Sequence, residues 1–210
     1  MMRNTLPPLA SNTSFSRQLL AQATPAVDQI VLNDFAQING QAIDRAAIHG
    51  AGTNESVGLY NLSGVNSVAM AGALTFAKVV DLESQIAINN GETDTSTLAY
   101  LSTPEIRARG KQIPELTGGS IRIWRDDRIN DRRAEVSNQV RKDLGGGSEH
   151  GIICGVWSEC LFLEWGASEI VVDPFRLKKQ GMIECSSFLL ANIVFRHPQS
   201  FSKGTGLTNT

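Results

Sequence analysis

Apolar positions recur every three or four residues in the segment after Thr24 and Pro25, and this spacing predicts one long amphipathic helix. The apolar stripe consists of Val27, Ile30, Val31, Phe35, Ile38, Ala42, Ile43 and Ala46. Thr24 suits the N-cap and Pro25 the first helical position, because proline there gives up no hydrogen bond that the helix needs. Gly50 is the expected stop, so the helix has about 25 residues and, at ~1.5 Å per residue, a length of roughly 37 Å.

Gly40 lies inside this predicted helix, where glycine costs about 1 kcal/mol relative to alanine. Each large apolar side chain that the helix buries contributes at most about 1.5–3 kcal/mol. Several such side chains outweigh one glycine, so we expect the helix to continue through Gly40.

A Gly/Asn/Ser-rich connector follows, from residue 50 to 72, and two shorter helices are predicted after it. Thr75 is placed to cap the first, which ends before Asn89. Thr103 and Pro104 repeat the start signal for a brief helix that Gly110 ends.

The predicted strands of the middle region are short. Alternation or β-branched composition predicts strands at residues 97–102 and 120–125. Three apolar runs predict either buried strands or an alternation of strands and helices, at residues 152–156, 161–165 and 169–172. The middle region therefore reads as a compact α/β unit.

The last apolar run, residues 182–195, is long enough for a major strand. It follows a cationic turn with Arg176, Lys178 and Lys179. A strand of this length must pair with segments far away in the sequence. We expect a sheet that lies beside the first helix.

Composition and charge exclude several classes of protein. The 210 residues are 41% hydrophobic, which is enough for the core of one domain or of two small ones. The net charge of -2 argues against condensation of nucleic acid by the protein's own charge. The polar start, residues 1–14, predicts neither a signal peptide nor a membrane span, and no apolar run reaches the ~18 residues of a transmembrane helix. The three cysteines, Cys154, Cys160 and Cys185, favour a reducing cytoplasm over a secreted disulfide framework.

One group of residues could carry chemistry. His150, Cys154 and Cys160 are close in sequence, but zinc needs a fourth ligand and the spacing fits no common zinc motif. On a strand, His150 and Cys154 share a face, so a Cys-His nucleophile pair of a small hydrolase stays an alternative. Two cysteines in an apolar run are more often small core residues. We therefore predict no catalytic, cofactor-binding or metal-binding residues.

Three further patterns have simpler readings than a ligand site. The mixed charge run from Arg125 to Arg133 predicts a solvated loop or, functionally, ion pairs between subunits. The glycines at residues 50–52 and 145–147 lack the sequence context of a phosphate-binding loop. The cations at residues 107–111 lack interleaved aromatic residues, so nucleic-acid binding is not predicted.

Both ends of the chain carry a family resemblance. The segment from Ser16 to Leu20, the stretch from Ala42 to Glu55 and the end from Val172 to Phe201, which includes Arg196-His197-Pro198, occur in an order and spacing that resemble the major capsid proteins of tailed bacteriophages and prophages. Gly58-Leu59-Tyr60-Asn61 resembles the turn of that family, in which many members carry proline where this chain has Ser56.

The resemblance implies an α+β fold of the Hong Kong 97 type. A peripheral domain, with a long spine helix and long β-strands, would comprise residues 23–62 and 175–204. An inserted axial α/β domain would comprise residues 63–174, and residues 205–210 would be a tail. Residues 1–22 would be a truncated N-terminal segment, since the family's N-terminal arm and extended loop precede the part that corresponds to Ser16.

The resemblance also implies a function: a structural subunit, not an enzyme, of an icosahedral shell that encloses DNA. When full-length, such subunits form pentamers and hexamers and meet scaffold, portal and protease proteins, with no membrane and no sequence-specific nucleic-acid partner. The shell would be assembled in the bacterial cytoplasm and become the virion. No isopeptide cross-links are expected, because Gln180 lies near the place of the family's cross-linking asparagine. An encapsulin-like compartment is the alternative of the same fold.

Overall fold

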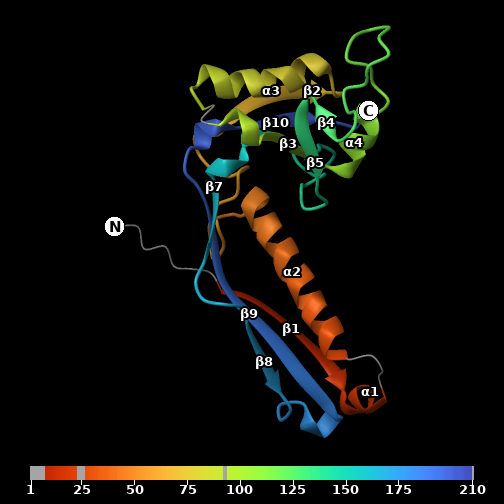
Figure 1. The fold of residues 1–210 in the computed structure, drawn as a ribbon, viewed down its shortest axis with the longest axis vertical. Helices are drawn as coiled ribbons and strands as arrows, with labels where there is room; N and C mark the ends of the chain where they lie inside the picture. Colours follow the sequence, from red (N-terminus) through yellow and green to blue (C-terminus); the bar gives the residue numbers. More distant parts are fainter. Residues whose placement is uncertain (1–7, 23–26, 92–93, 210) are drawn as a thin grey trace.

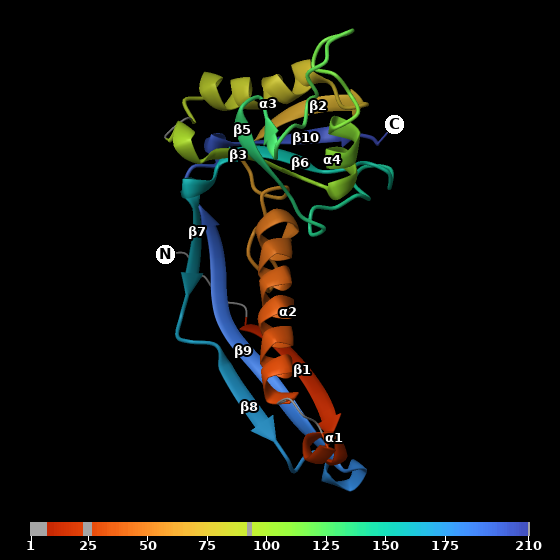
Figure 2. The same ribbon diagram turned by 45° about the vertical axis from the view of Figure 1, so that its right-hand side comes forward.

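The computed structural model describes residues 8–22, 27–91 and 94–209. Figure 1 and Figure 2 show a compact lobe from which a long arm extends. We call residues 8–22, 27–49 and 160–195 the arm, and residues 66–156 and 201–207 the lobe. Each has its own sheet, so the fold is α+β as expected.

The arm contains one long helix, α2 (Val27–His49), which confirms the predicted helix and its continuation through Gly40. Thr24 and Pro25 lie outside the described residues. Phe35 of the predicted stripe is buried, and so is Ile48 near the end of the helix. Ile30 and Ile38 of the stripe are 54% and 51% exposed. The stripe is thus only partly buried, because the sheet covers one side of the helix.

The long sheet of the arm lies beside α2, as predicted. Its central strand, β9 (Met182–Phe195), pairs antiparallel with β1 (Pro8–Ser16) along one edge. Along its other edge lie β7 (Cys160–Glu164) and β8 (Glu169–Asp173), one after the other. A short helix, α1 (Arg17–Gln22), follows β1. Residues 8–22, expected as a truncated segment, therefore form a strand and a helix that complete the arm.

The lobe contains a mixed six-stranded sheet in the order β2-β10-β6-β3-β5-β4. Its strands are β2 (Asn66–Gly72), β3 (Leu98–Ser102), β4 (Arg128–Ile129), β5 (Arg132–Val136), β6 (Ile152–Val156) and β10 (Phe201–Leu207). Its helices are α3 (Phe76–Ile88) and α4 (Pro104–Gly110). Short 3-10 turns connect elements at Thr95–Thr97, Trp157–Glu159, Lys178–Gln180 and Pro198–Ser200.

The two faces of the lobe sheet are both covered. Along β6, Ile152, Cys154 and Val156 face the lobe core with α3, whereas Ile153 belongs to a second cluster. We call this second cluster the junction cluster; its buried members are Ile48, Leu59, Val140, Ile153, Ile193, Phe195 and Phe201. It contains side chains of α2, β9, β6 and β10, so it joins arm and lobe. A strand covered on both faces is apolar throughout, which explains the unbroken run in β6.

Several sequence predictions need correction. Residues 120–125 form no strand: Ile123 and Trp124 are buried from a loop, whose amides donate to Ile113 and Gly110, and Ile121 is 47% exposed. The three apolar runs are all strands, but β7 and β8 pair with β9 rather than with the lobe. Residues 201–207, divided in the prediction between peripheral domain and tail, form a lobe strand.

The charged run from Arg125 to Arg133 is a tight double hairpin rather than a loop. Two successive pairs of residues have positive φ: Asp126 and Asp127, then Asn130 and Asp131. Two such residues in a row make the turn that suits the twist of a two-residue hairpin, and Asn and Asp tolerate it better than other residues with a side chain. β4 lies between these two turns.

Candidate assembly surface

The arm exposes an unusual number of large apolar side chains. Those between 37% and 73% exposed on its sheet and its connecting loops are Leu161, Phe162, Trp165, Ile170, Val171, Val172, Phe175, Phe188 and Leu190. Scattered exposed apolar residues are ordinary, but a contiguous set on one element indicates a contact surface. We call this set the arm surface.

The arm surface has two sides because side chains alternate along a strand. Ser187 and Leu189 of β9 are buried toward α2, so Phe188 and Leu190, each 42% exposed, lie on the opposite face of the sheet. Val171 pairs with Ser186 in β9 and shares that outer face. The outer face has no covering layer among the described residues.

On the inner face, a groove lies between α2 and the strands. It has a volume of about 420 Å³. The side chains and backbone that line it come from Leu32, Phe35, Ala36, Asn39, Gly40, Ile43, Phe162, Glu164, Ser168, Ile170, Ser187 and Leu189. We call it the α2 groove. Most of its lining is apolar.

A chain of polar contacts fixes α2 on the sheet beside the α2 groove. Asn39 Nδ2 donates to Ser187 Oγ at 3.0 Å, and Ser11 Oγ of β1 donates to Asn39 Oδ1 at 3.1 Å. Ser168 Oγ lies 3.3 Å from Ser187 Oγ. Asn39 and Ser187 are buried, and buried polar groups are costly unless they are bonded. This network specifies one position of the helix along the sheet.

The far end of the arm is a structured turn. Asp173 Oδ1 accepts hydrogen bonds from the amides of Phe175 (2.7 Å) and Arg176 (3.2 Å). Arg17 donates to the Pro174 carbonyl at 2.9 Å, and Arg176 forms an ion pair with Glu184. The turn therefore presents Phe175, which is 73% exposed, among the predicted cations at Arg176, Lys178 and Lys179.

At the other end of α2, His49 connects the arm to the lobe. Its ring stacks on Tyr60 at 4.7 Å, and its Nε2 accepts a hydrogen bond from the Arg141 amide at 3.0 Å. Burial, followed by the neighbouring Arg141, lowers the pKa of His49 to about 4. With this pKa, His49 is neutral at pH 7 and places no positive charge at the C-terminal end of α2. Asn61 Nδ2 bonds the last carbonyls of α2 instead, at 2.9 Å each.

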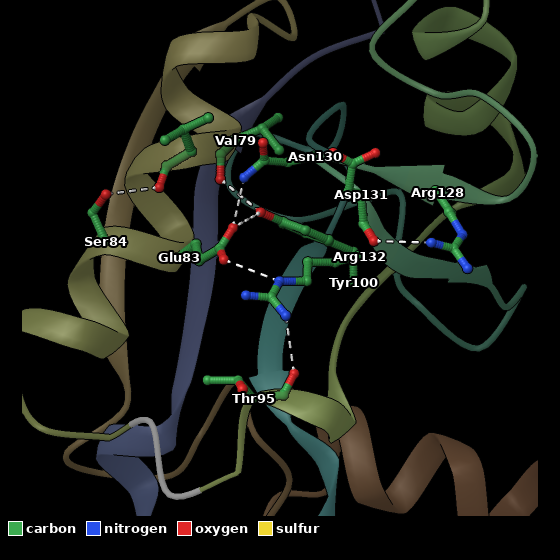
Figure 3. Close-up of polar contacts among 10 residues, drawn as sticks. Val79, Glu83, Ser84, Thr95, Tyr100, Arg128, Asn130, Asp131 and Arg132 are labelled. Atoms are coloured by element: carbon green, nitrogen blue, oxygen red, sulfur yellow. Dashed lines mark hydrogen bonds and ion pairs between the residues drawn. The ribbon is translucent and has the colours of Figure 1, made fainter.

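Within the lobe, Glu83 of α3 holds the double hairpin in place (Figure 3). It accepts from Asn130 Nδ2 at 2.8 Å and from Arg132 Nε at 3.2 Å, and Tyr100 Oη lies 3.4 Å away. Arg132 also donates to the Thr95 carbonyl at 3.1 Å. The charged run thus makes ion pairs inside the chain; whether it also pairs between subunits stays a prediction.

The sequence matches the profile of the Phage capsid family over residues 5–206. The chain belongs to the phage capsid family. This capsid-family chain is 26% identical over 190 residues to the major capsid protein of Halomonas phage phiHAP-1, a match that covers 90% of the chain and 30% of the relative. It therefore spans about a third of the length of that curated relative.

Solved structures show the same fold for this capsid-family chain. The capsid of a native GTA particle has a TM-score of 0.73 at 14% identity, covering 95% of the chain and 72% of the other. The SrpI encapsulin from Synechococcus elongatus PCC 7942 has a TM-score of 0.67 at 15% identity, covering 98% and 75%. The Hong Kong 97-type fold is thus confirmed.

The residues considered for chemistry in this capsid-family chain are not brought together. Cys154 is fully buried in the lobe core, and His150 Nδ1 is bonded to Thr103 Oγ1 at 3.0 Å. Burial raises the pKa of the Cys160 thiol to about 11, the opposite of what a thiolate nucleophile needs. In the part of the chain that the structure describes, no His, Cys, Asp and Glu side chains gather into a possible metal site.

The arm surface was not predicted from the sequence. The signal was present: residues 161–163 and 170–172 are apolar at consecutive positions, and so have apolar side chains on both faces of a strand. Their apolar composition predicts buried strands or an alternation of strands and helices, not exposed strands. On the edge strands of the four-stranded arm sheet, the same pattern leaves apolar groups exposed. None of the described helices combines the length and apolar character that a bilayer crossing requires.

Proposed function

We propose that this chain is a structural subunit of an icosahedral phage or prophage shell that encloses DNA. Family membership and the fold support this, and the observation that carries it is the arm surface. An elongated arm with apolar groups on both faces cannot bury them within one copy. Shells close through many repeated contacts of that kind.

We further propose that the arm is the peripheral domain and the lobe the axial domain that gathers around fivefold and sixfold positions. The sequence-based division at residues 62 and 175 is then adjusted, with residues 160–173 in the peripheral part and 201–207 in the axial part. The pairing of β7 and β8 with β9, and of β10 with β2 and β6, supports this assignment.

The finer aspects of the function are also proposals. The shell would be assembled in the bacterial cytoplasm and would become the virion, with scaffold, portal and protease proteins as partners. The role would be structural, without catalysis. The buried position of Cys154 supports this over the cysteine hydrolase.

An encapsulin-like compartment is the second candidate, because the fold similarity to the SrpI encapsulin supports it as well. The contents of purified particles separate the two. Nuclease-protected DNA inside the shell indicates a capsid, whereas a single enclosed protein indicates a compartment.

The test of the shared proposal is self-association. Sedimentation velocity over a concentration series, with negative-stain electron microscopy of the largest species, is expected to show oligomers that grow with concentration into rings or curved sheets. A chain that stays monomeric at every concentration and salt condition contradicts a shell function.

A further inference from the structure

We propose that the α2 groove receives the Phe175 side chain from the arm tip of a second copy of this chain. This inference rests on the proposed function, since it specifies how two shell subunits meet. The groove and the tip are separate parts of the same arm, and four observations connect them.

The first observation is Gly40. Apart from the adjacent helix backbone, a Cβ atom at this position would meet no atom of the described residues within 4 Å, so none of them requires glycine there. Glycine is a poor residue for the interior of a helix. It lines the α2 groove, where the absence of a side chain lets another group approach the helix backbone closely.

The second observation is the unfilled apolar lining around Gly40. Leu32, Phe162 and Ile170 line the groove from three elements and are 41%, 49% and 40% exposed. Aromatic side chains bury the largest apolar area of any residue, at about 150–250 Å² each. A groove of about 420 Å³ with such a lining suits one aromatic ring and its backbone.

The third observation is the order of the tip. Phe175 is 73% exposed, yet Asp173 bonds its amide and Arg17 bonds the preceding carbonyl. An exposed aromatic residue on a turn that is already ordered loses little conformational freedom on binding. These are the properties of an interface anchor.

The fourth observation is charge. Glu164 lines the groove and Glu169 begins β8 close to it; both are exposed. Lys178 and Lys179 follow Phe175 in the tip and are exposed too. Across the described residues, no ion pair involves any of these four side chains. Opposite charges at the rims of two contacting surfaces fix orientation and raise the rate of association.

A chain cannot fill its own groove. Asp173 pairs with Glu184 in β9, whereas the nearest groove residue of β9 is Ser187, three residues along the strand or roughly 10 Å at ~3.3 Å per residue. The bonds to Asp173 and Arg17 hold Phe175 at the tip. The contact is therefore between copies and head to tail, which joins successive subunits into a ring or an open array.

The test uses two variants that each remove one half of the contact. Phe175→Ala removes the anchor and Gly40→Trp fills the groove from an open position. Each variant alone is expected to weaken self-association at least about tenfold. An equimolar mixture is expected to form heterodimers and nothing larger, because the intact tip of one fits only the intact groove of the other.

Two controls complete the test. Leu116→Ala removes a side chain that is also 73% exposed, but in the lobe, and is expected to leave association unchanged. Gly40→Ala is expected to raise the melting temperature by about 2–4 °C while weakening self-association. If Gly40 had only a structural role in the helix, the substitution would not weaken self-association. Circular dichroism verifies the fold of each variant.

Outcomes that overturn the inference differ from those that overturn the function. If both variants self-associate as well as the unaltered chain does, the groove is not the contact and the shell function stands. The same conclusion follows if an equimolar mixture of the two variants forms no heterodimers. If the unaltered chain never self-associates, the proposed function fails and this inference fails with it.

Discussion

Asn39 is a buried polar residue of α2, and the apolar stripe of this helix does not predict its burial. The period of Phe35, Ile38 and Ala42 predicts the helix but not which side of it is covered. In the structure Asn39 is 7% exposed and Ile38 is 51% exposed. The partners of Asn39 lie in β1 and β9, and contacts between such distant residues cannot be read from local spacing.

Asn39→Ala should therefore destabilise the chain by about 1–3 kcal/mol, because it leaves the fully buried Ser187 hydroxyl short of a partner. Urea denaturation measures the effect. Asn33→Ala is the matched control: Asn33 is exposed and bonds only Gln29 across one helical turn, so a change within about 0.5 kcal/mol is expected. Equal effects of the two substitutions would contradict the role of the network.

His49 gives the chain a pH dependence with a definite sign. Its pKa of about 4 in the folded chain lies below the ordinary value of 6.5, so the unfolded chain binds the proton first as the pH falls. The stability that neutral His49 contributes is complete above about pH 6.5 and is lost between pH 6.5 and 4. His49→Gln should flatten the slope of unfolding free energy against pH in this window. An unchanged slope would show that His49 does not titrate as its burial beside Arg141 implies.

At the scale of elements, the sequence predicted those with a strong local signal. The helices α2, α3 and α4 and the strands β3, β6 and β9 have clear periods, apolar runs or start signals. β1, β2 and β10 have none: they are rich in small and polar residues and form by pairing with strands far away in the sequence, β1 with β9 and β10 with both β2 and β6. In β10, a Cβ on Gly204 would lie 2.4 Å from Ile152 Cγ2, so close packing selects the residue that made the strand hard to recognise.

The double hairpin depends on Glu83, and this dependence can be tested. Glu83→Ala should cost about 1.5–3 kcal/mol, because its side chain, 17% exposed, bonds Arg132 and Asn130, and the substitution removes the carboxylate partner of both. Glu135→Ala is the control, since Glu135 pairs with Arg133 at 53% and 76% exposure and such pairs are worth about 0–1 kcal/mol. Thermal denaturation of both variants measures these losses of stability. A larger loss in the Glu135→Ala control would contradict the role of the Glu83 contacts shown in Figure 3.

At the scale of the molecule, the junction cluster decides whether arm and lobe behave as one body. Phe201 is fully buried in it, with its ring edge-on to Phe195 at 5.2 Å and to Trp157 at 5.7 Å. The sequence could not reveal this cluster, because its members come from segments as far apart in the chain as Ile48 and Phe201. Their proximity follows only from the route of the whole chain.

Phe201→Ala should cost about 3–5 kcal/mol and separate the unfolding of the two parts. Calorimetry is expected to give one transition for the unaltered chain and two for the variant. Phe188→Ala, which alters a ring that is 42% exposed on the arm, should keep one transition. A single transition in both variants would mean that other contacts couple arm and lobe.

The route of the chain has a further consequence. It passes between arm and lobe at residues 50–65, again at 157–159 and again at 196–200. After a cut at any one of these passages, the two pieces remain paired in a sheet, through β1 with β9, through β10 with β2 and β6, or through both. A protease that nicks the chain there would therefore release no fragment under native conditions, and the break would become visible only after the protein is denatured.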